Sequence, residues 1–583
     1  MNRTHNNGEL RISDVNKIVE LKGWVAKKRN LGSLVFIDLR DRYGITQIVL
    51  NEEMEALAKD IKNEYVIHVV GKVIERSSKN PNMPTGDIEI EASQIDIINT
   101  AKVTPIYTSD DTDASEDARM QYRYLDLRRP VMQNKIITRH KITRSIRDFL
   151  DNHDFIDIET PYLNRSTPEG ARDFLVPSRV HNGSFYALPQ SPQLFKQLLM
   201  VSGFERYYQI ARCFRDEDLR LDRQPEFTQV DVEMSFMNTD EIITLGEQLI
   251  AKVMKDVKGI DLQLPLLRMT WHEAMEKYGI DKPDIRFGLE LVNLNEVVKD
   301  VDFMVFKSAL EANGHVKGIN VKGEANNFSR KAIDKLTDIV KTYKAKGLAW
   351  LKVKDGKAEG PIAKFFNDEQ MTRLLTAMDA SDDDLLLFVS DAKYSVVCDA
   401  LAALRNHLGK ELKLYRQDEY AFLWVVDFPM FEYDEETKRY YAVHHPFTRP
   451  KDSDLDKIEN DPANCLADAY DIVLNGFELG GGSQRIYEQE LQERAFRALG
   501  FTQERIDSQF GWFVEAFQYG TPPHGGFALG LDRLAMILTN SENIREVIAF
   551  PKNASAVCPM SKAPGKVDKE QLDELKIAVI EDE

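Results

Sequence analysis

Residues 212–236 read RCFRDEDLRLDRQPEFTQVDVEMSF and predict two strands joined by a charged loop. The preceding residues 207–211 are β-prone, and residues 227–233 alternate with a period of two. That alternation places a ring, an amide and two acids on one face of the second strand: Phe227, Gln229, Asp231 and Glu233. Acids are costly to bury without partners, so the pattern is typical of an antiparallel sheet that presents a polar ligand site. The alternative interpretation is a solvated, charged hairpin.

Residues 525–538, GGFALGLDRLAMIL, predict a small-residue strand that runs into an apolar helix near Asp532. Gly530 allows a ligand to approach the backbone closely. Arg533 falls in the first helical turn, where the helix dipole disfavours a cation. We therefore expect Arg533 to bind an anion.

Together these stretches resemble motifs 2 and 3 of the class II aminoacyl-tRNA synthetases. Motif 1 is matched by an amphipathic helix expected at 135–151 and a strand at 155–161 that ends at Pro161. In the family this proline lies at the dimer interface, so the resemblance implies a homodimer. Across the whole chain the sequence is similar to the bacterial-type aspartyl-tRNA synthetases.

The fold class expected is multidomain α+β, beginning with an OB-fold β-barrel at residues 1–104. The strands and the helix expected there are 21–28, 33–41, 45–50, 65–75 and 87–98, with the helix at 54–62. A basic hinge follows at 105–134. The resemblance implies a class II catalytic domain, an antiparallel sheet with flanking helices, in two parts at 135–287 and 421–562.

Between these two parts, residues 288–420 resemble the α+β insertion domain of the bacterial-type enzymes. Helices are expected at 303–312 and 329–344, and strands at 348–353 and 385–390. The acids at 382–384 are interpreted as a solvated turn. Residues 563–583 form a C-terminal extension without a recognisable signal.

The composition, 43% hydrophobic and 29% charged over 583 residues, is that of an ordinary globular protein. The chain opens without an apolar run and has no stretch resembling a membrane span. Its four cysteines form no CxxC pair, which argues against a zinc site and for the cytoplasm. The net charge of −19 does not exclude a nucleic acid, because binding needs only a local basic surface such as 27–29 or 119–129.

The resemblance implies that ATP is a substrate. Arg215 would hold its α-phosphate and Arg533 its γ-phosphate, and these two arginines are the expected catalytic residues. Phe227 would stack under the adenine ring. The full set expected at ATP is Arg215, Asp216, Glu217, Gln224, Phe227, Glu478, Gly530, Leu531, Asp532 and Arg533.

L-Aspartate is the amino acid implied by the resemblance. Arg485 and Lys196 would hold its side-chain carboxylate, and Asp231 and Glu169 its ammonium group. The full set expected at aspartate is Glu169, Ser191, Gln193, Lys196, Arg215, Asp231, His444 and Arg485. His445 follows His444, and adjacent side chains on a strand point in opposite directions, so at most one of the two histidines is expected to face the ligand.

Asp471 and Glu478 are acids within an otherwise apolar segment. Burying them is costly unless a cation compensates. We expect Mg²⁺ there, bridging the phosphates of ATP.

The barrel of the family binds the tRNA anticodon. The matching positions here are Arg29, Leu31, Phe36, Gln47, Lys79, Asn80 and Glu89. Alternation leaves undecided whether Phe36 stacks on a base or packs in the core. In the family, a leucine at position 31 and a lysine at position 79 accompany enzymes that charge tRNA-Asp alone, so this chain is expected to discriminate against tRNA-Asn; an enzyme that charges both tRNAs is the alternative.

The expected activity is that of an aspartate–tRNA ligase. Arg485, Lys196 and the insertion at 288–420 argue against a related asparaginyl or lysyl enzyme. The presence of Arg215, Arg533, Asp471 and Glu478 argues against a non-catalytic RNA-binding paralogue. The complete anticodon-type barrel argues against an enzyme that makes an amide from aspartate without tRNA.

Overall fold

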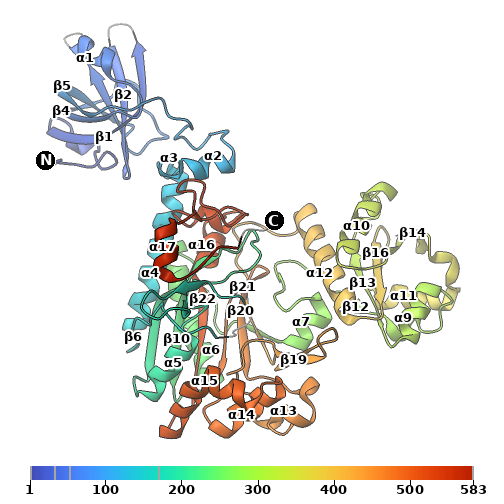
Figure 1. Cartoon of the computed structure of the whole chain (residues 1–583). Helices are drawn as coiled ribbons and strands as arrows, with labels where there is room; N and C mark the ends of the chain where they lie inside the picture. Colours follow the sequence, from blue (N-terminus) through green and yellow to red (C-terminus); the bar gives the residue numbers. More distant parts are fainter. Residues whose placement is uncertain (1–2, 32–33, 52–53, 168–170, 581–583) are drawn as a thin grey trace. The chain divides into compact units, whose positions relative to one another are not determined.

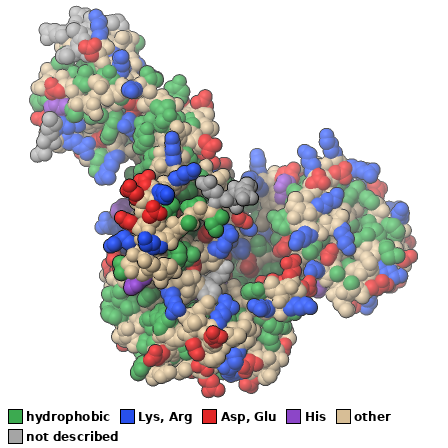
Figure 2. Space-filling model, in the orientation of Figure 1, with side chains coloured by type: hydrophobic (Ala, Val, Ile, Leu, Met, Phe, Trp, Pro, Cys, Tyr) green, Lys and Arg blue, Asp and Glu red, His purple; other side chains and the backbone are tan. Residues whose placement is uncertain are grey.

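The structure is a computed structural model that describes residues 3–580 except 32–33, 52–53 and 168–170. It divides into two units, one of residues 1–138 with 545–566 and one of residues 139–544 with 567–583. Within the described part, no helix combines the length and the apolar character that crossing a bilayer requires. On the face drawn in Figure 2, basic and acidic side chains are interspersed.

The first unit contains a closed five-stranded barrel with strand order β1-β2-β3-β5-β4 (Figure 1). Its elements are β1 Ile18–Leu31, β2 Leu34–Asp41, β3 Gly44–Leu50, α1 Glu55–Asp60, β4 Val66–Glu75 and β5 Ile88–Asn99. The predicted OB-fold is confirmed, including the helix after the third strand. The observed first strand, β1, extends beyond the expected range 21–28 at both ends.

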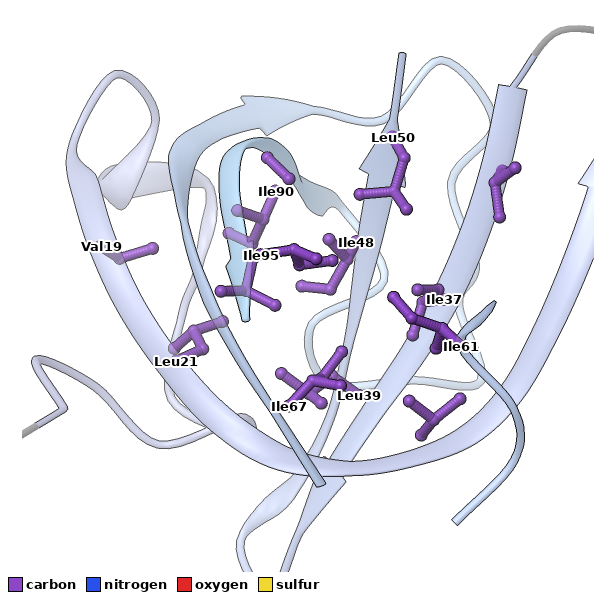
Figure 3. Packing of buried hydrophobic residues seen from close by; sticks show 14 of the residues in the cluster. Val19, Leu21, Ile37, Leu39, Ile48, Leu50, Ile61, Ile67, Ile90 and Ile95 are labelled. Carbon is purple, nitrogen blue, oxygen red and sulfur yellow. The ribbon is translucent and has the colours of Figure 1, made fainter. Parts of the chain in front are cut away.

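Branched aliphatic side chains fill the barrel (Figure 3). On β2 the buried apolar residues are Val35, Ile37 and Leu39. Because side chains alternate along a strand, Phe36 and Asp38 lie on the outer face. This answers the question that the sequence left open, since Phe36 is outside the barrel core.

Two short helices, α2 Glu116–Gln121 and α3 Arg123–Asp126, follow the barrel. The buried guanidinium of Arg123 donates to the carbonyl oxygens of Arg545, Ile548 and Ala549 at 2.7, 2.9 and 2.9 Å. The later part of the predicted hinge is thus helical, and its Arg123 holds residues 545–549. Helix α4 Pro130–Asp151 begins earlier than the helix expected at 135–151.

The second unit is built on an eight-stranded sheet with the order β11-β17-β20-β21-β22-β10-β9-β6. The strands are β6 Ile156–Asp157, β9 Arg206–Phe214, β10 Glu226–Ser235, β11 Leu267–Thr270, β17 Phe422–Val426, β20 Ala469–Leu474, β21 Phe477–Gln484 and β22 His524–Gly530. All neighbours are antiparallel except the two edge pairs, β11 with β17 and β6 with β9. The strand expected at 155–161 was too long, since only two of its residues pair.

Helix α6 Thr239–Lys258 covers one face of this sheet. It begins with a capping box of Asn238 and Glu241 and ends at Gly259, whose φ is 70°. A side chain on Gly246 would meet the rings of Trp424 and Phe527, so α6 packs closely on the central strands. The opposite face carries the polar side chains described below. Helix α5 Gln193–Val201 begins just after Ser191 and helix α16 Leu531–Leu538 just after Gly530, and both of these residues lie at this face.

Residues 288–420, expected from the sequence to be an insertion domain, form a five-stranded antiparallel sheet with helices. Its strand order is β12-β13-β16-β14-β15. The main elements are β12 Leu291–Asn293, α9 Met304–Glu311, β13 His315–Val321, α10 Arg330–Thr342, β14 Ala349–Lys354, β15 Lys357–Glu359, α11 Asp368–Ala377, β16 Leu385–Asp391 and α12 Tyr394–Glu411. The predicted α+β character is confirmed.

One detail of the insertion domain corrects the sequence analysis. Asp384 is 2% exposed, so the acids at 382–384 are not simply a solvated turn. Its carboxylate accepts hydrogen bonds from Asn320 Nδ2, Ser381 N and Gly323 N at 2.9, 2.9 and 2.8 Å. These bonds satisfy a buried charge and tie two loops together.

Candidate active site

A cavity of about 410 Å³ opens on the sheet face opposite α6. Its walls come from β10, β20, β21, β22, the ends of α5 and α16, and the loop after β9. Charged residues of both signs line it: Lys196, Arg215, Glu217, Asp222, Arg223, Asp231, Asp471, Glu478, Arg485, Asp532 and Arg533. Such a lining suits a ligand that carries several charges.

One part of the cavity suits a nucleotide. The guanidinium of Arg215 lies 5.2 Å from the ring centre of Phe227. Nε of Arg215 is buried and has no hydrogen-bond partner among the described residues. Glu217 and Gln224 line the same region, and Glu217 pairs with Arg223 at 2.8 Å. A ring, a cation and an amide together can bind a purine and an adjacent phosphate.

Arg533 faces the cavity from the first turn of α16. Its Nη2 donates to Asp222 at 3.1 Å, and its Nη1 donates to the carbonyl oxygen of Glu478. Nε of Arg533 is buried without a hydrogen-bond partner in the described part of the chain. The arginine therefore keeps donor capacity for an anion.

The carboxylate of Asp532 binds other residues of the chain. It is 1% exposed, accepts from Thr228 N at 2.6 Å and also binds Arg139. The carboxylate thus joins α16, α4 and β10. Gly530 also lines the cavity, whereas the other two expected ATP residues, Asp216 and Leu531, do not.

A buried network of four charges occupies another part of the site. Nζ of Lys196 lies 2.6 Å from Asp231 and 3.3 Å from Glu233. The guanidinium of Arg485 binds both carboxylate oxygens of Glu233, at 2.8 and 3.1 Å. All four side chains are at most 2% exposed. The two cations and two anions balance, which is what permits their burial.

The pKa values within the network reflect these contacts. Burial acts to raise the pKa of Glu233, but Arg485 and Lys196 together hold it at about 2. Burial raises the pKa of Asp231, although Lys196 opposes the change. Burial and then Arg485 lower the pKa of His445, so its neutral Nε2 can accept the hydrogen bond from Arg485 Nη1 at 2.8 Å.

The two adjacent histidines correct one expectation. Both His444 and His445 line the cavity. Strand β19 Arg439–Ala442 ends before them, so strand alternation does not apply to the pair. Nε2 of His444 lies 3.2 Å from Asp471.

A β-bulge brings the two expected metal ligands to one face. Asp471 pairs with Gly481, whereas Val473 pairs with Glu478, and the register shifts by one residue between them. Residues opposite each other share a face, and so do residues two apart on a strand, so Glu478 lies on the face of Asp471. Without the extra residue, Glu478 would point to the other side.

The acidic pair fits a magnesium ion in its chemistry. Burial, followed by the charge of Glu478, raises the pKa of Asp471 even though His444 opposes the change. A divalent cation would relieve that repulsion. Within the described residues no cluster of three metal-ligating side chains occurs. Two carboxylate groups are the ligand type that suits Mg²⁺, which binds through one or two carboxylates and completes its shell with phosphate oxygens and water.

The remaining expected residues are placed as follows. Ser191 and Gln193 line the cavity. Glu169 lies outside the described residues. Sequence reasoning did not assign roles to Glu233, Asp222, Arg139 and His445, although alternation along β10 already placed Glu233 beside Asp231.

The outer face of the barrel carries a second polar network. Nη2 of Arg29 donates to Asp38 at 2.6 Å and to Gln47 at 3.1 Å. Gln47 in turn donates to Glu89 at 2.6 Å and accepts from Arg76 at 3.0 Å. These bonds bring together three of the expected anticodon positions, Arg29, Gln47 and Glu89. Phe36 is the fourth, because it pairs directly with Arg29 across β1 and β2.

The other three anticodon positions lie around this network on loops or strand ends. Leu31 is 65% exposed at the end of β1. Lys79 pairs with Glu75 at 2.8 Å, and both are about half exposed. The side-chain oxygen of Asn80 accepts from Asn82 N at 3.1 Å.

Two family models match the sequence. Residues 115–554 match the tRNA synthetases class II (D, K and N), and residues 19–98 match an OB-fold nucleic acid binding domain. A Halalkalibacterium halodurans protein named aspartate–tRNA ligase is 58% identical over 99% of this chain and 98% of its own length. A Bacillus cereus protein named aspartate–tRNA(Asp/Asn) ligase is 58% identical over the same shares.

Solved structures share the fold at lower identity. The asparaginyl-tRNA synthetase of Pyrococcus horikoshii with asparaginyl-adenylate has a TM-score of 0.58 and 18% identity, over 93% of this chain and 96% of that one. That of Entamoeba histolytica with asparaginyl-adenylate has a TM-score of 0.59 and 17% identity, over 94% and 98%.

Proposed function

The chain belongs to the class II tRNA synthetases of the D, K and N family, and we propose that it is an aspartate–tRNA ligase. The observation that carries the proposal is the buried network of Lys196, Asp231, Glu233 and Arg485 in the same cavity as Arg215, Phe227 and Arg533. Along β10, Phe227 and Glu233 are six residues apart, roughly 20 Å at 3.3 Å per residue. One strand thus serves a nucleotide at one end and an amino acid at the other.

The first step joins aspartate to ATP. The α-carboxylate of aspartate attacks the α-phosphorus, a P–O bond forms, and the bond to pyrophosphate breaks, giving aspartyl-adenylate. Arg215 stabilises charge at the α-phosphate and Arg533 at the γ-phosphate, while Phe227 supports the adenine. Positioning and charge neutralisation account for the rate, and no protein nucleophile is needed.

Asp471 and Glu478 would hold the magnesium ion, which supplies positive charge at the phosphate oxygens when bound. Arg533 also donates a hydrogen bond to the carbonyl oxygen of Glu478. In the second step the terminal adenosine of the tRNA attacks the aspartyl carbonyl carbon with a hydroxyl group, an ester forms, and AMP leaves.

The selectivity for aspartate follows from the two cations. Arg485 and Lys196 bind the side-chain carboxylate, and Asp231 binds the ammonium group. The neutral amide of asparagine offers these cations no anionic group, so it would compete poorly with Glu233 and Asp231 for them and bind more weakly than aspartate. Aspartate-dependent exchange of pyrophosphate into ATP tests this step; exchange with asparagine at a comparable rate would contradict it, and exchange with neither would support a non-catalytic RNA-binding protein.

The anticodon is read on the outer face of the barrel. The partly exposed ring of Phe36 offers a stacking surface, and Arg29, Gln47 and Glu89 offer hydrogen-bonding groups to base edges. Lys79 adds a charge beside this face, and its exposed ion pair with Glu75 is weak enough to exchange for a phosphate.

The tRNA choice has two candidates. Leu31 and Lys79 support an enzyme that charges tRNA-Asp alone, because a leucine cannot offer a hydrogen bond to a second base. The name of the Bacillus cereus relative favours the second candidate, an enzyme that charges tRNA-Asp and tRNA-Asn. Charging of purified tRNA-Asp and tRNA-Asn transcripts decides: comparable rates would contradict the first candidate.

A homodimer completes the proposal. Apolar side chains around the match to motif 1 are exposed in the single chain: Ile156 by 47%, Tyr162 by 45% and Leu163 by 54%. A partner subunit would cover them. The four cysteines are buried thiols in the part of the chain that the structure describes, which suits the reducing cytoplasm. Light scattering that shows an active monomer would contradict the dimer.

A further inference from the structure

The hairpin of β20 and β21 carries the acidic pair, and its tip is the turn Asn475–Gly476. Leu474 pairs with Phe477 across the turn. Asn475 and Gly476 have φ values of 53° and 84°. This is the left-handed backbone of a two-residue hairpin turn, for which Asn-Gly is the preferred sequence. The turn lies a few residues from both Asp471 and Glu478, so its position affects theirs.

The chain that leaves the insertion domain holds this tip. Residues 412–421 are here called the outbound connector. Nδ2 of Asn475 donates to the carbonyl oxygen of Glu419 at 2.8 Å, and Oδ1 of Asn475 accepts from Ala421 N at 2.9 Å. Asn475 N also donates to the carbonyl oxygen of Ala421 at 3.2 Å. Both ends of one buried amide are therefore committed to the outbound connector.

The chain that enters the insertion domain touches the same tip. Residues 279–290 are here called the inbound connector. A methyl group on Gly476 would lie 3.2 Å from Cβ of Asp284, so the turn rests against the inbound connector. Arg286 binds Asp284 at 2.6 and 2.9 Å and lies 3.8 Å from the ring centre of Tyr415 in the outbound connector. The two connectors are thus joined to each other beside the turn.

The inbound connector also brings charge to the acidic pair. Asp281 and Lys282 form an ion pair at 2.9 Å. Burial acts to lower the pKa of Lys282, but Asp281, Glu478 and Asp471 together raise it. The ammonium group of the connector therefore lies in the field of the two carboxylates.

A helix of the insertion domain grips the inbound connector. Arg405 of α12 is 1% exposed and donates to the carbonyl oxygens of Asp284, Phe287 and Gly288 at 2.9, 2.6 and 2.7 Å. Its guanidinium also lies 4.1 Å from the ring centre of Phe287. The three carbonyl oxygens lie around the one atom Nη2, and Nε donates to the carbonyl oxygen of Gly288 at 3.0 Å, so a single guanidinium holds both ends of the segment 284–288.

We infer that the two connectors position the acidic pair, with Asn475 and Arg405 as positioning residues for the magnesium–ATP site. The inference rests on the proposed function, since magnesium and ATP are its ligands. The bulge between Asp471 and Glu478 makes the arrangement sensitive, because a slip of one residue would turn Glu478 away from the cavity. The contacts of Asn475 with the outbound connector and of Gly476 with the inbound connector hold the hairpin in that register.

The test begins with Asn475→Gly, which keeps the left-handed backbone and removes both side-chain bonds. The readout is the affinity for ATP measured by calorimetry at a series of Mg²⁺ concentrations, which requires no aspartate activation. We expect the Mg²⁺ concentration needed for half-maximal ATP binding to rise roughly tenfold, the smaller end of the effect seen for groups that orient metal ligands. The KM for aspartate should stay at the wild-type value.

Asn313→Gly is the matched control. Asn313 is an exposed asparagine of the insertion domain with a φ of 56°, so the substitution repeats the backbone change away from the hairpin. It should bind ATP as the wild type does at every Mg²⁺ concentration. Asn475→Asp keeps the acceptor for Ala421 N but sets a carboxylate oxygen against the carbonyl oxygen of Glu419, and should shift the Mg²⁺ dependence in the same direction.

Arg405→Lys tests the insertion domain itself. A lysine keeps the charge but loses the separate Nε bond to Gly288 and the planar contact with the ring of Phe287. We expect a shift of the Mg²⁺ dependence in the same direction as for Asn475→Gly. Wild-type Mg²⁺ dependence in either Asn475→Gly or Arg405→Lys, in protein with a measured Tm that shows it is folded, would overturn the inference.

The two proposals fail separately. If the wild type shows no aspartate-dependent pyrophosphate exchange, the proposed function is wrong whatever the variants bind. If the wild type is active and the variants bind Mg²⁺ and ATP as it does, only the positioning role is wrong.

Discussion

Nζ of Lys196 donates a hydrogen bond to Oδ1 of Asp231 at 2.6 Å, and both side chains are buried. The ammonium comes from α5 and the carboxylate from the central strand β10. The ammonium of Lys196 is opposite in charge to the carboxylates of free aspartate, and the carboxylate of Asp231 is opposite in charge to its ammonium group. The site thus holds its own cation and anion in the place where a substrate with both charges would exchange partners with them.

Lys196→Met should weaken aspartate binding and destabilise the fold. The variant leaves Asp231 and Glu233 with one cation fewer in a buried setting, at a cost of about 3–5 kcal/mol in the free energy of unfolding. We expect the KM for aspartate to rise by about 100-fold or more, as for the loss of a charged hydrogen bond. Steady-state pyrophosphate exchange and urea unfolding measure the two effects.

The control for that variant is Lys393→Met, which removes a lysine from an exposed pair with Glu435. Exposed pairs contribute little, so its stability and its KM should match the wild type. A KM for aspartate in Lys196→Met within threefold of the wild type would contradict the role of the pair.

Arg485→Leu should abolish aspartate activation while ATP still binds. The guanidinium is the only group that binds both oxygens of Glu233 among the described residues, and its loss from a desolvated pocket is worth about 3–5 kcal/mol. Calorimetry with ATP and exchange assays with aspartate separate the two ligands. Near wild-type exchange would show that another group holds the carboxylate.

Acid should weaken one specific contribution to stability. Glu233 has a pKa of about 2 in the folded protein against an ordinary value of 4.5. A carboxyl group whose pKa is lower in the folded state stabilises the protein above its unfolded pKa, and the stabilisation is lost as the pH falls from about 4.5 towards 2.

The difference in free energy of unfolding between the wild type and Glu233→Gln should therefore be largest at neutral pH and shrink below pH 4.5. Urea unfolding across that range measures it. A difference independent of pH would mean that the ion pair with Arg485 does not set the pKa.

Phe36→Ala should weaken tRNA binding and leave aspartate activation unchanged. The ring lies on the outer face of β2, outside the barrel core, and a stacked base is worth about 1–3 kcal/mol. Filter binding of tRNA-Asp measures the loss. Tyr43→Ala removes another half-exposed ring of the barrel and should bind tRNA as the wild type does.

Much of the fold could be predicted because its signals are local. Alternation and turn residues located the barrel strands and the β9–β10 hairpin, and the change from small residues to an apolar helix located β22 and α16. The short β6 was overestimated, because β-propensity at 155–161 does not show how many residues find a partner strand.

The sequence indicated which kinds of residue line the site better than it indicated which of them touch one another. The bulge that places Glu478 beside Asp471 depends on the register of two strands, which no single strand reveals. Glu233 and His445 went unassigned for a related reason: their roles depend on Arg485, which lies far away in the sequence. Asp532 matched a nucleotide motif, yet its carboxylate binds Arg139 and Thr228.

The most direct test of the account is aminoacylation with the purified full-length chain, ATP, Mg²⁺ and a tRNA-Asp transcript, comparing labelled aspartate with labelled asparagine. The network of Lys196, Asp231, Glu233 and Arg485 predicts that aspartate is attached to the tRNA and that asparagine is not. Attachment of asparagine at a comparable rate, or of neither amino acid, would contradict the account.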